Sequence, residues 1–127
     1  GYTYSSHALA CAAGLAALDV YADEGLFAHA RALEGHWEQA LHGLAGLPHV
    51  IDIRNFGLIA GIELASIPGQ PGVRGQNLFR ALFDSGLLIR VTGDIIALSP
   101  PLIISAAQID EIAGRLAEGL RQLADAG

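Results

Sequence analysis

Four segments of the chain have hydrophobic patterns typical of helices: residues 5–23 are dense in alanine and leucine, and in residues 26–44, 74–85 and 109–123 hydrophobic residues recur at helical spacing. The first segment carries alanine and leucine on most of its faces, which is typical of a helix buried on several sides. We therefore predict a helix for each segment, with Gly25 separating the first two.

Polar residues before two of these segments predict where the helices begin. Ser5 or Ser6 precedes the first alanine-rich turn and is the expected N-cap of that helix. Ser105 and Gln108 have the spacing of a capping box, in which each side chain bonds to the backbone N–H of the other residue. The last helix is therefore expected to begin directly after Ser105.

Between the helical segments the hydrophobic pattern is that of β-strands. Residues 50–54, 58–64, 87–91 and 95–98 are short runs rich in β-branched and aliphatic residues. Pro100 and Pro101 should end the fourth strand, because proline has no N–H to donate to a neighbouring strand.

The order of these elements predicts a fold class. Helix, helix, strand, strand, helix, strand, strand, helix gives an α+β architecture, with a small, mainly antiparallel sheet and helices on one face. Residues 55–57 and the pair Gly93-Asp94 are expected to form turns, and residues 66–75, rich in proline and glycine, a surface loop.

Composition supports a globular chain and narrows its partners. Of the 127 residues, 52% are hydrophobic and 16% charged, which is enough apolar surface to form a core. The net charge of −6 makes nucleic acid an unexpected partner, and no apolar run is long enough to cross a membrane.

Three features of the composition concern the origin of the chain. The chain has no methionine and starts at Gly1, so we expect a fragment of a longer protein. The one cysteine, Cys11, cannot form an intrachain disulfide, which favours the cytoplasm, and its alanine-rich surroundings predict a buried structural thiol. All seven basic residues are arginine, so no lysine amine is present.

The histidines do not form a recognisable metal site. Their spacing lacks the close pairs of a zinc site, and no cysteine or carboxylate pair completes a ligand set. We expect surface or capping roles for all five, His7, His29, His36, His42 and His49.

The first seven residues are a candidate anion site. They are polar, aromatic and rich in hydroxyl groups, and they lead directly into a helix N-terminus, where the backbone N–H groups and the dipole favour an anion. Thr3 would add a short hydroxyl donor. The alternative is an ordinary helix cap.

Arg90 is the second candidate. It lies in the otherwise apolar run of residues 87–91, and a guanidinium in such surroundings often recognises a carboxylate through two parallel hydrogen bonds. An arginine on an edge strand or in a structural salt bridge is the alternative.

Three segments resemble a known family. Residues 1–13 read GYTYSSHALACAA, residues 57–64 read GLIAGIEL, and residues 86–102 read GLLIRVTGDIIALSPPL. The first is similar to the G-Y-T-Y-S-G-H-P-x-A-C-A-A stretch of class III aminotransferases. The second resembles the strand after that family's hinge helix, and the third resembles the branch acting on ω-amino acids and pyruvate. Ser6 and Ala8 depart from the pattern, which usually has glycine and proline at these positions.

The resemblance implies a fold-type I enzyme with pyridoxal 5'-phosphate (PLP) as cofactor, assembled as a homodimer or homotetramer. It implies transfer of an amino group from an ω-amino acid such as β-alanine to pyruvate. Residues 1–25 would be the end of the large domain and a linking helix, and residues 26–127 the C-terminal small domain, packed against the N-terminal large domain. Thr3 would bind the PLP phosphate of the neighbouring subunit and Arg90 the substrate carboxylate, whereas the catalytic lysine would lie outside the chain.

Two alternatives remain open at this point. One is a small-molecule-binding or oligomerisation domain of ferredoxin-like shape, in which Arg90 would bind an acidic effector. The other is an ornithine- or diamine-type transaminase of the same class.

Overall fold

The computed structural model describes residues 2–125, with side chains to residue 123, so Gly1 lies outside the described residues. The four predicted helices are present, as α1 (Ala8–Asp23), α2 (Leu26–His42), α3 (Val73–Asp84) and α4 (Ala106–Asp125). Gly25 separates α1 from α2 in the left-handed conformation, with φ of 61°, which glycine adopts at little cost.

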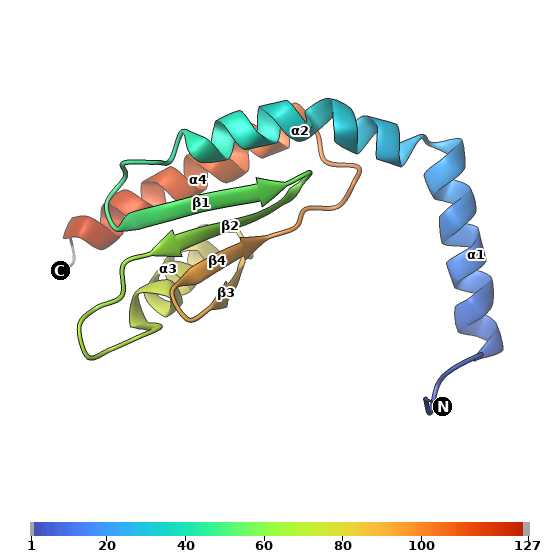
Figure 1. The fold of residues 1–127 in the computed structure, drawn as a ribbon, viewed down its shortest axis with the longest axis horizontal. Coiled ribbons are helices and arrows are strands. Elements are labelled where there is room, and N and C mark those ends of the chain that lie inside the picture. The colour runs from blue at the N-terminus through green and yellow to red at the C-terminus, as the bar shows by residue number, and fades with distance from the viewer. Residues whose placement is uncertain (1, 126–127) are drawn as a thin grey trace.

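Four strands form one antiparallel sheet. They are β1 (Val50–Phe56), β2 (Ile59–Leu64), β3 (Arg90–Thr92) and β4 (Ile95–Leu98), in the spatial order β1-β2-β4-β3. Every neighbouring pair is antiparallel, and α2, α3 and α4 pack on one face of the sheet (Figure 1). The predicted α+β architecture is confirmed.

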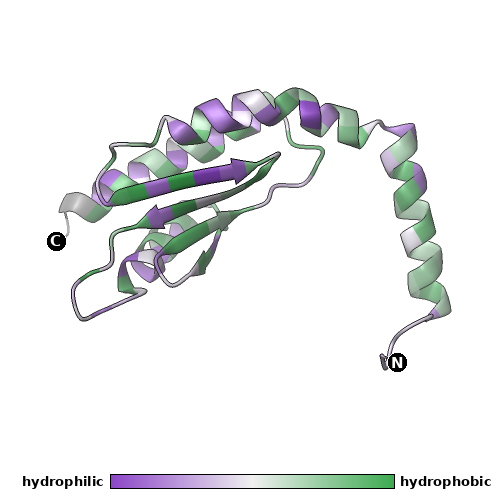
Figure 2. Ribbon diagram, in the orientation of Figure 1, coloured by the Kyte–Doolittle hydropathy of each residue, from purple (hydrophilic) through white to green (hydrophobic). Residues whose placement is uncertain are grey.

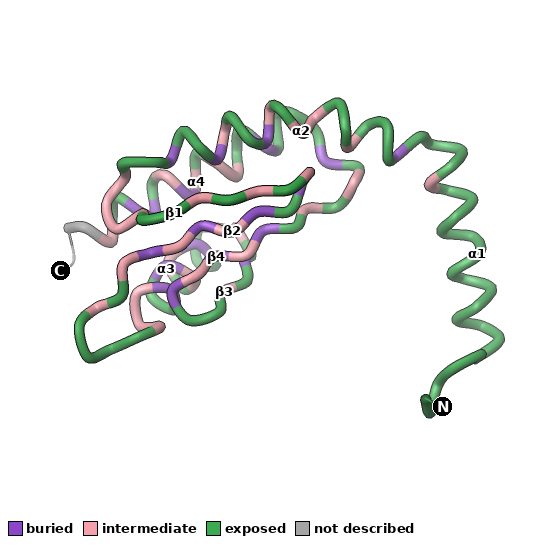
Figure 3. Tube along the Cα trace, in the orientation of Figure 1, coloured by how far each residue is buried: buried purple, intermediate pink, exposed green. Residues whose placement is uncertain are grey.

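The core lies between the sheet and these three helices. Side chains alternate along a strand, so every second residue of β2 and β4 points towards the helices. The buried residues from the strands meet buried residues from α2, α3 and α4, and Figure 3 shows them along the inner side of both layers. The fully buried side chains are Trp37, Leu41, Ile62, Leu64, Leu78, Leu82, Ile96, Ile109, Leu116 and Leu120.

Helix α1 stands apart from this core. It extends away from the sheet and meets the rest of the chain through α2 (Figure 1). None of its residues is buried, although most of its surface is hydrophobic (Figures 2 and 3). Cys11 is exposed, so the prediction of a buried thiol is wrong for this chain, because no element described here covers α1. Among the residues with described side chains, every buried one falls within 26–120, and the predicted domain division after residue 25 stays a prediction.

The predicted cap is present at the N-terminus of α4, whereas the N-cap of α1 is a different residue from the one predicted. The capping box of α4 is confirmed, because Ser105 N–H donates to Gln108 Oε1 at 3.0 Å and Gln108 N–H to Ser105 Oγ at 3.3 Å. The N-cap of α1 is His7, whose ring accepts from Ala10 N–H, and not Ser5 or Ser6.

The backbone at Ser6 explains this difference. Ser6 has φ of 61°, in the left-handed region, whereas an N-cap residue normally has an extended backbone. Glycine would adopt this conformation more readily than serine. Ala8 is the first residue of α1, a position where proline is well tolerated.

The third strand is shorter than predicted. β3 begins at Arg90, and residues 87–89 are not paired with β4, so the expectation of a strand over 87–91 is wrong for its first three residues. Arg90 pairs with Ala97, so continuing the ladder backwards would place Leu87 opposite Pro100, which cannot donate a hydrogen bond. Pro100 therefore keeps Leu87 out of the ladder, and Arg90 is the first residue of this edge strand.

Over residues 2–125, no helix has both the length and the hydropathy that a bilayer span needs.

Candidate functional site

A row of four residues crosses the uncovered face of the sheet, one from each strand. The register places Arg54 of β1 beside Gly61 of β2, Gly61 beside Ala97 of β4, and Ala97 beside Arg90 of β3. The residues that alternate with this row along β2 and β4 belong to the core, so the row faces away from the helices. An arginine therefore lies at each end of the row, and the two residues between them, glycine and alanine, leave the face of the sheet flat.

Arg54 is neutralised by its neighbours. Its guanidinium donates to Glu63 at 3.0 Å and to Asp52, and these hydrogen bonds raise its pKa above the ordinary value. A Cβ atom on Gly61 would lie 3.6–3.9 Å from the Arg54 side chain, so the arginine lies across this glycine. Because two carboxylates already pair with Arg54, its guanidinium is a poor binding group for a further anion.

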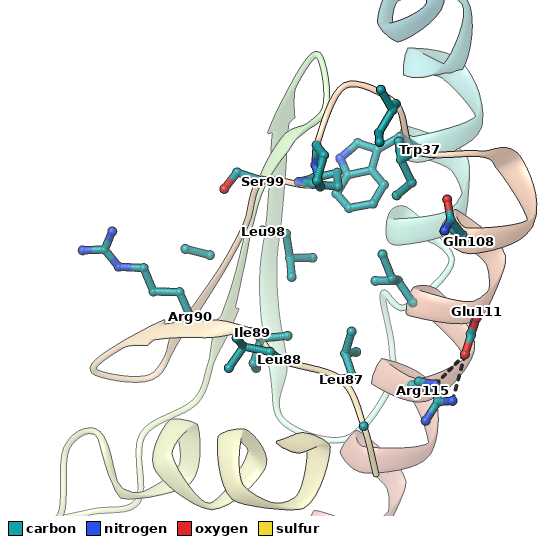
Figure 4. Close-up of a pocket in the computed structure, with 17 residues that line it drawn as sticks. Trp37, Leu87, Leu88, Ile89, Arg90, Leu98, Ser99, Gln108, Glu111 and Arg115 are labelled. Atoms are coloured by element: carbon teal, nitrogen blue, oxygen red, sulfur yellow. Dashed lines mark hydrogen bonds and ion pairs between the residues drawn. The ribbon is translucent and has the colours of Figure 1, made fainter. Parts of the chain in front are cut away.

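A cavity of about 740 Å³ lies on the other side of the sheet, towards α4. Trp37, Leu87 and Leu98 contribute to its mostly apolar wall, and Arg115 at its edge pairs with Glu111 at 2.8 Å (Figure 4). Trp37 is fully buried, and its Nε1–H has no hydrogen-bond partner among the described residues. The cavity is thus a mostly apolar space in which Arg115 and Glu111 pair with each other.

Arg90 and Arg54 are both exposed, but Arg90, unlike Arg54, has no acidic partner in the described part of the chain. Its residue borders the cavity, but the guanidinium points away from it, over the uncovered face of the sheet (Figure 4). This face is where a carboxylate from outside the chain could reach it with both oxygens.

The hairpin that carries Arg90 is held by Asp94, at the turn between β3 and β4. The Asp94 carboxylate accepts hydrogen bonds from Ser66 Oγ at 2.6 Å, Gly72 N–H at 2.8 Å and Gly75 N–H at 2.8 Å. Gly72 is the N-cap of α3 and has no side chain, so Asp94 caps this helix from a distant part of the chain.

This network keeps the carboxylate ionised. Burial alone raises the pKa of Asp94, but the hydrogen bonds from Ser66, Gly72 and Gly75, together with the charge of Arg74, outweigh it and leave the pKa below its ordinary value. From the sequence alone, Asp94 is recognisable only as a turn residue. Its donors lie 19 to 28 positions away, so no local spacing reveals the role; only the unusual acidic residue between apolar strands hints at it.

Thr3 lies far from Arg90. It is exposed in a turn before α1, where Ser5 N–H donates to Tyr2 O at 3.1 Å, and its hydroxyl has no hydrogen bond within residues 2–125. The segment before α1 lies at the end of that helix remote from the sheet (Figure 1), and the 16 residues of α1 span about 24 Å. The structure therefore does not bring the two candidate residues into one site.

Three of the histidines make tertiary hydrogen bonds that link separate elements of the fold. His29 bonds to the carbonyl oxygen of Ile104 at 2.8 Å, His36 to Asp110 at 2.8 Å and His42 to Asn55 at 2.9 Å. Among the described residues, no three histidine, cysteine or acidic side chains gather where they could share a metal ion. These contacts agree with the surface and capping roles that the sequence predicts.

Comparisons with known proteins cover nearly the whole chain. Residues 1–120 match the family model of aminotransferase class III. The chain is 57% identical over 123 residues to an omega-aminotransferase of Caulobacter vibrioides, covering 97% of this chain and 27% of that protein. It is 40% identical over 124 residues to a beta-alanine–pyruvate aminotransferase of Pseudomonas aeruginosa, covering 98% and 28%.

The fold agrees with the same group. A solved structure described as a transaminase with L-Ala superposes with a TM-score of 0.91 at 31% identity, covering 99% of this chain and 31% of that one. The chain thus spans between a quarter and a third of the length of these relatives.

Proposed function

The chain belongs to the aminotransferase class III family, and from this premise we propose that the full-length protein transfers an amino group from an ω-amino acid such as β-alanine to pyruvate. Two similar proteins support this substrate class, the omega-aminotransferase at 57% identity and the beta-alanine–pyruvate aminotransferase at 40%. In this proposal residues 1–25 close the large domain and link it to the small domain, residues 26–127. The same proposal places the enzyme in the cytoplasm as a homodimer or homotetramer.

The exposed guanidinium of Arg90, which has no acidic partner among the described residues, carries the proposal. Both β-alanine and pyruvate have a carboxylate, which a guanidinium binds through two parallel hydrogen bonds. The other arginine of the row, Arg54, already pairs with Glu63 and Asp52, so Arg90 is the one of these two that can accept a new partner. Arg90 would hold the carboxylate end of either substrate, and so fix the distance and angle at which the reacting carbon is presented.

Class III aminotransferases depend on PLP, and Thr3 is the residue of this chain that would contact it. Its exposed hydroxyl, without a hydrogen-bond partner in the described residues, suits a phosphate oxygen. PLP supplies an electron sink that makes the carbon-bound proton next to the amino group removable. The separation of Thr3 from Arg90 along α1 supports an arrangement in which they serve the active sites of different subunits.

The proton transfer itself needs an amine that these residues lack. The sequence contains seven arginines and no lysine, so the lysine that would move the proton lies elsewhere in the full-length protein. Arg90 and Thr3 would therefore bind and orient, and residues 1–127 alone would not catalyse transamination.

A second candidate function is transamination of an ornithine-type donor. The chain is 40% identical over 124 residues to an acetylornithine aminotransferase of Bordetella parapertussis, covering 96% of this chain and 30% of that protein. Membership of the family leaves the other alternative, an independent ligand-binding or oligomerisation domain, without support.

The test is an assay of the purified full-length protein with PLP and pyruvate, in which alanine formation is measured with β-alanine or with N-acetylornithine as donor. We expect faster alanine formation with β-alanine. Faster formation with N-acetylornithine would support the second candidate, and no alanine with either donor would contradict both. Residues 1–127 alone should form no alanine.

A further inference from the structure

Arg90 lies on the least supported strand of the sheet. β3 has three residues, is at the edge of the sheet, and bonds to β4 on one side only. A short edge strand with one partner has few backbone hydrogen bonds to fix it. The position of Arg90 therefore depends on what holds the β3–β4 hairpin elsewhere.

The hairpin is held at its turn, four positions after Arg90. Asp94 is only 7% exposed, and its carboxylate takes three hydrogen bonds of 2.6–2.8 Å from Ser66, Gly72 and Gly75. These donors belong to the loop after β2 and to the N-terminus of α3, so the turn is joined to two other parts of the fold. All three hydrogen bonds are accepted by the single side chain of Asp94.

Backbone contacts add to this joint. The carbonyl oxygen of Asp94 accepts a hydrogen bond from Leu64 N–H at 2.9 Å, at the end of β2. The backbone of Gly93 lies against α3, so close to Gly75 that a Cβ atom there would be 2.3 Å from the Gly93 oxygen. The turn is thus packed between β2 and α3 with little room to shift.

We propose that Asp94 is a positioning residue for Arg90: by joining the hairpin turn to the N-terminus of α3, it sets where the guanidinium stands over the uncovered face of the sheet. The Asp94 carboxylate bonds to the N-terminus of α3, whereas the Arg90 guanidinium extends over the uncovered face of the sheet, so Asp94 acts through the backbone of β3 and β4 and not on the substrate. The inference rests on the proposed function, in which Arg90 binds the substrate carboxylate.

The test is a double-mutant cycle in the full-length enzyme, read out as the KM for pyruvate. Asp94→Asn keeps the size of the side chain but places an amide NH₂ where an N–H or O–H donor now points. We expect the KM for pyruvate to rise about three- to tenfold in the Asp94→Asn variant, since a small displacement of a binding group costs this much or more. The rate with a donor amine that has no carboxylate should change far less.

Comparing the effect of Asp94→Asn in the wild-type protein and in the Arg90→Ala protein distinguishes a positioning role from a general loss of structure. In the Arg90→Ala protein, Asp94→Asn should cause no further rise in the KM for pyruvate, because the group it positions is gone. An equal rise in both backgrounds, or an equal loss with the uncharged amine, would overturn the inference. Asp110→Asn removes an exposed carboxylate from α4 that bonds to His36, and serves as the matched control with unchanged KM.

Two further variants distinguish failure of the positioning role of Asp94 from misfolding and from failure of the proposed function of Arg90. If Asp94→Asn does not fold, Ser66→Ala removes only one of the three hydrogen bonds and should give a smaller rise of the same KM; a folded Ser66→Ala protein with unchanged KM would overturn the inference. If Arg90→Ala itself leaves the KM for pyruvate unchanged, the proposed function of Arg90 fails. A rise with Arg90→Ala and none with Asp94→Asn rejects the positioning role alone.

Discussion

Gly75, in the first turn of α3, lies directly against the carbonyl oxygen of Gly93 in the β3–β4 turn. A Cβ atom on Gly75 would be 2.3 Å from that oxygen and 3.1 Å from the Cα of Asp94, both of which are backbone atoms that cannot rotate away. This close approach lets Gly75 N–H reach the Asp94 carboxylate at 2.8 Å. The absence of a side chain at position 75 is therefore a condition for the Asp94 network.

Replacing this glycine should destabilise the fold. Gly75→Ala forces the hairpin turn away from α3, and we expect the free energy of unfolding to fall by roughly 1–3 kcal/mol or more. Gly35→Ala is the matched control, because Gly35 lies inside α2 with nothing within 4 Å of its Cβ position. That substitution should stabilise the chain by about 0.5–1 kcal/mol. Urea unfolding of both variants measures the difference, and two similar values would contradict the close approach.

The stability of the chain should fall at acid pH through Asp94. The pKa of Asp94 in the folded chain is below its ordinary value of 3.8, so the unfolded chain binds a proton first as the pH drops. The stabilisation is complete above the ordinary pKa and is lost as the pH falls through the pKa of the folded state. Asp94→Asn should lower the free energy of unfolding by about 1–3 kcal/mol at neutral pH, because donors lose their charged acceptor.

Urea unfolding of the wild-type chain and the Asp94→Asn variant, at several pH values between 7 and 3, tests this. The two curves should approach each other at the acid end. His49 also has a pKa lowered by burial and by Arg74, which weakens the fold as the pH drops, but it is present in both proteins and cancels in the comparison. A constant difference between the two curves over the whole range would contradict the account.

Helix α1 should make the isolated chain self-associate. Its large aliphatic residues Leu9, Leu15 and Leu18 are each at least 60% exposed, and none of its residues is buried. An apolar helix surface of this kind is favourable to cover. We expect the weight-average mass in sedimentation equilibrium to rise with concentration, and Leu15→Glu with Leu18→Glu to reduce the rise. A monomer at all concentrations would contradict this expectation.

The elements governed by local patterns were predictable from the sequence. The alternation of residues along β2 and β4 and the capping box of Ser105 and Gln108 both depend on neighbours within a few positions. The extent of β3 was not predictable in this way, because it depends on which residues of the neighbouring strand and of the segment after it face residues 87–89; Leu87, for example, would face a proline. Register is a property of two strands and cannot be read from one.

In the candidate site, too, only the residue that stands out from its neighbours in the sequence was predictable. Arg90 was identifiable because a charged residue in an apolar strand is unusual in the sequence itself. Asp94 was not, because its partners Ser66 and Gly75 come near it only after the chain has folded. Cys11 was placed in the core because of its alanine-rich helix, whereas burial of that helix would need residues beyond those described.

The claim that Arg90 binds the substrate carboxylate is tested most directly by the kinetics of the Arg90→Ala variant of the full-length enzyme. The half-reaction with pyruvate should show a KM raised roughly 10- to 100-fold, the value of a charged bidentate hydrogen bond, while the half-reaction with an amine that lacks a carboxylate should be nearly unchanged. Arg54→Ala, which removes the paired arginine of the same row, should leave both unchanged. Equal effects of Arg90→Ala on pyruvate and on the uncharged amine would contradict the account.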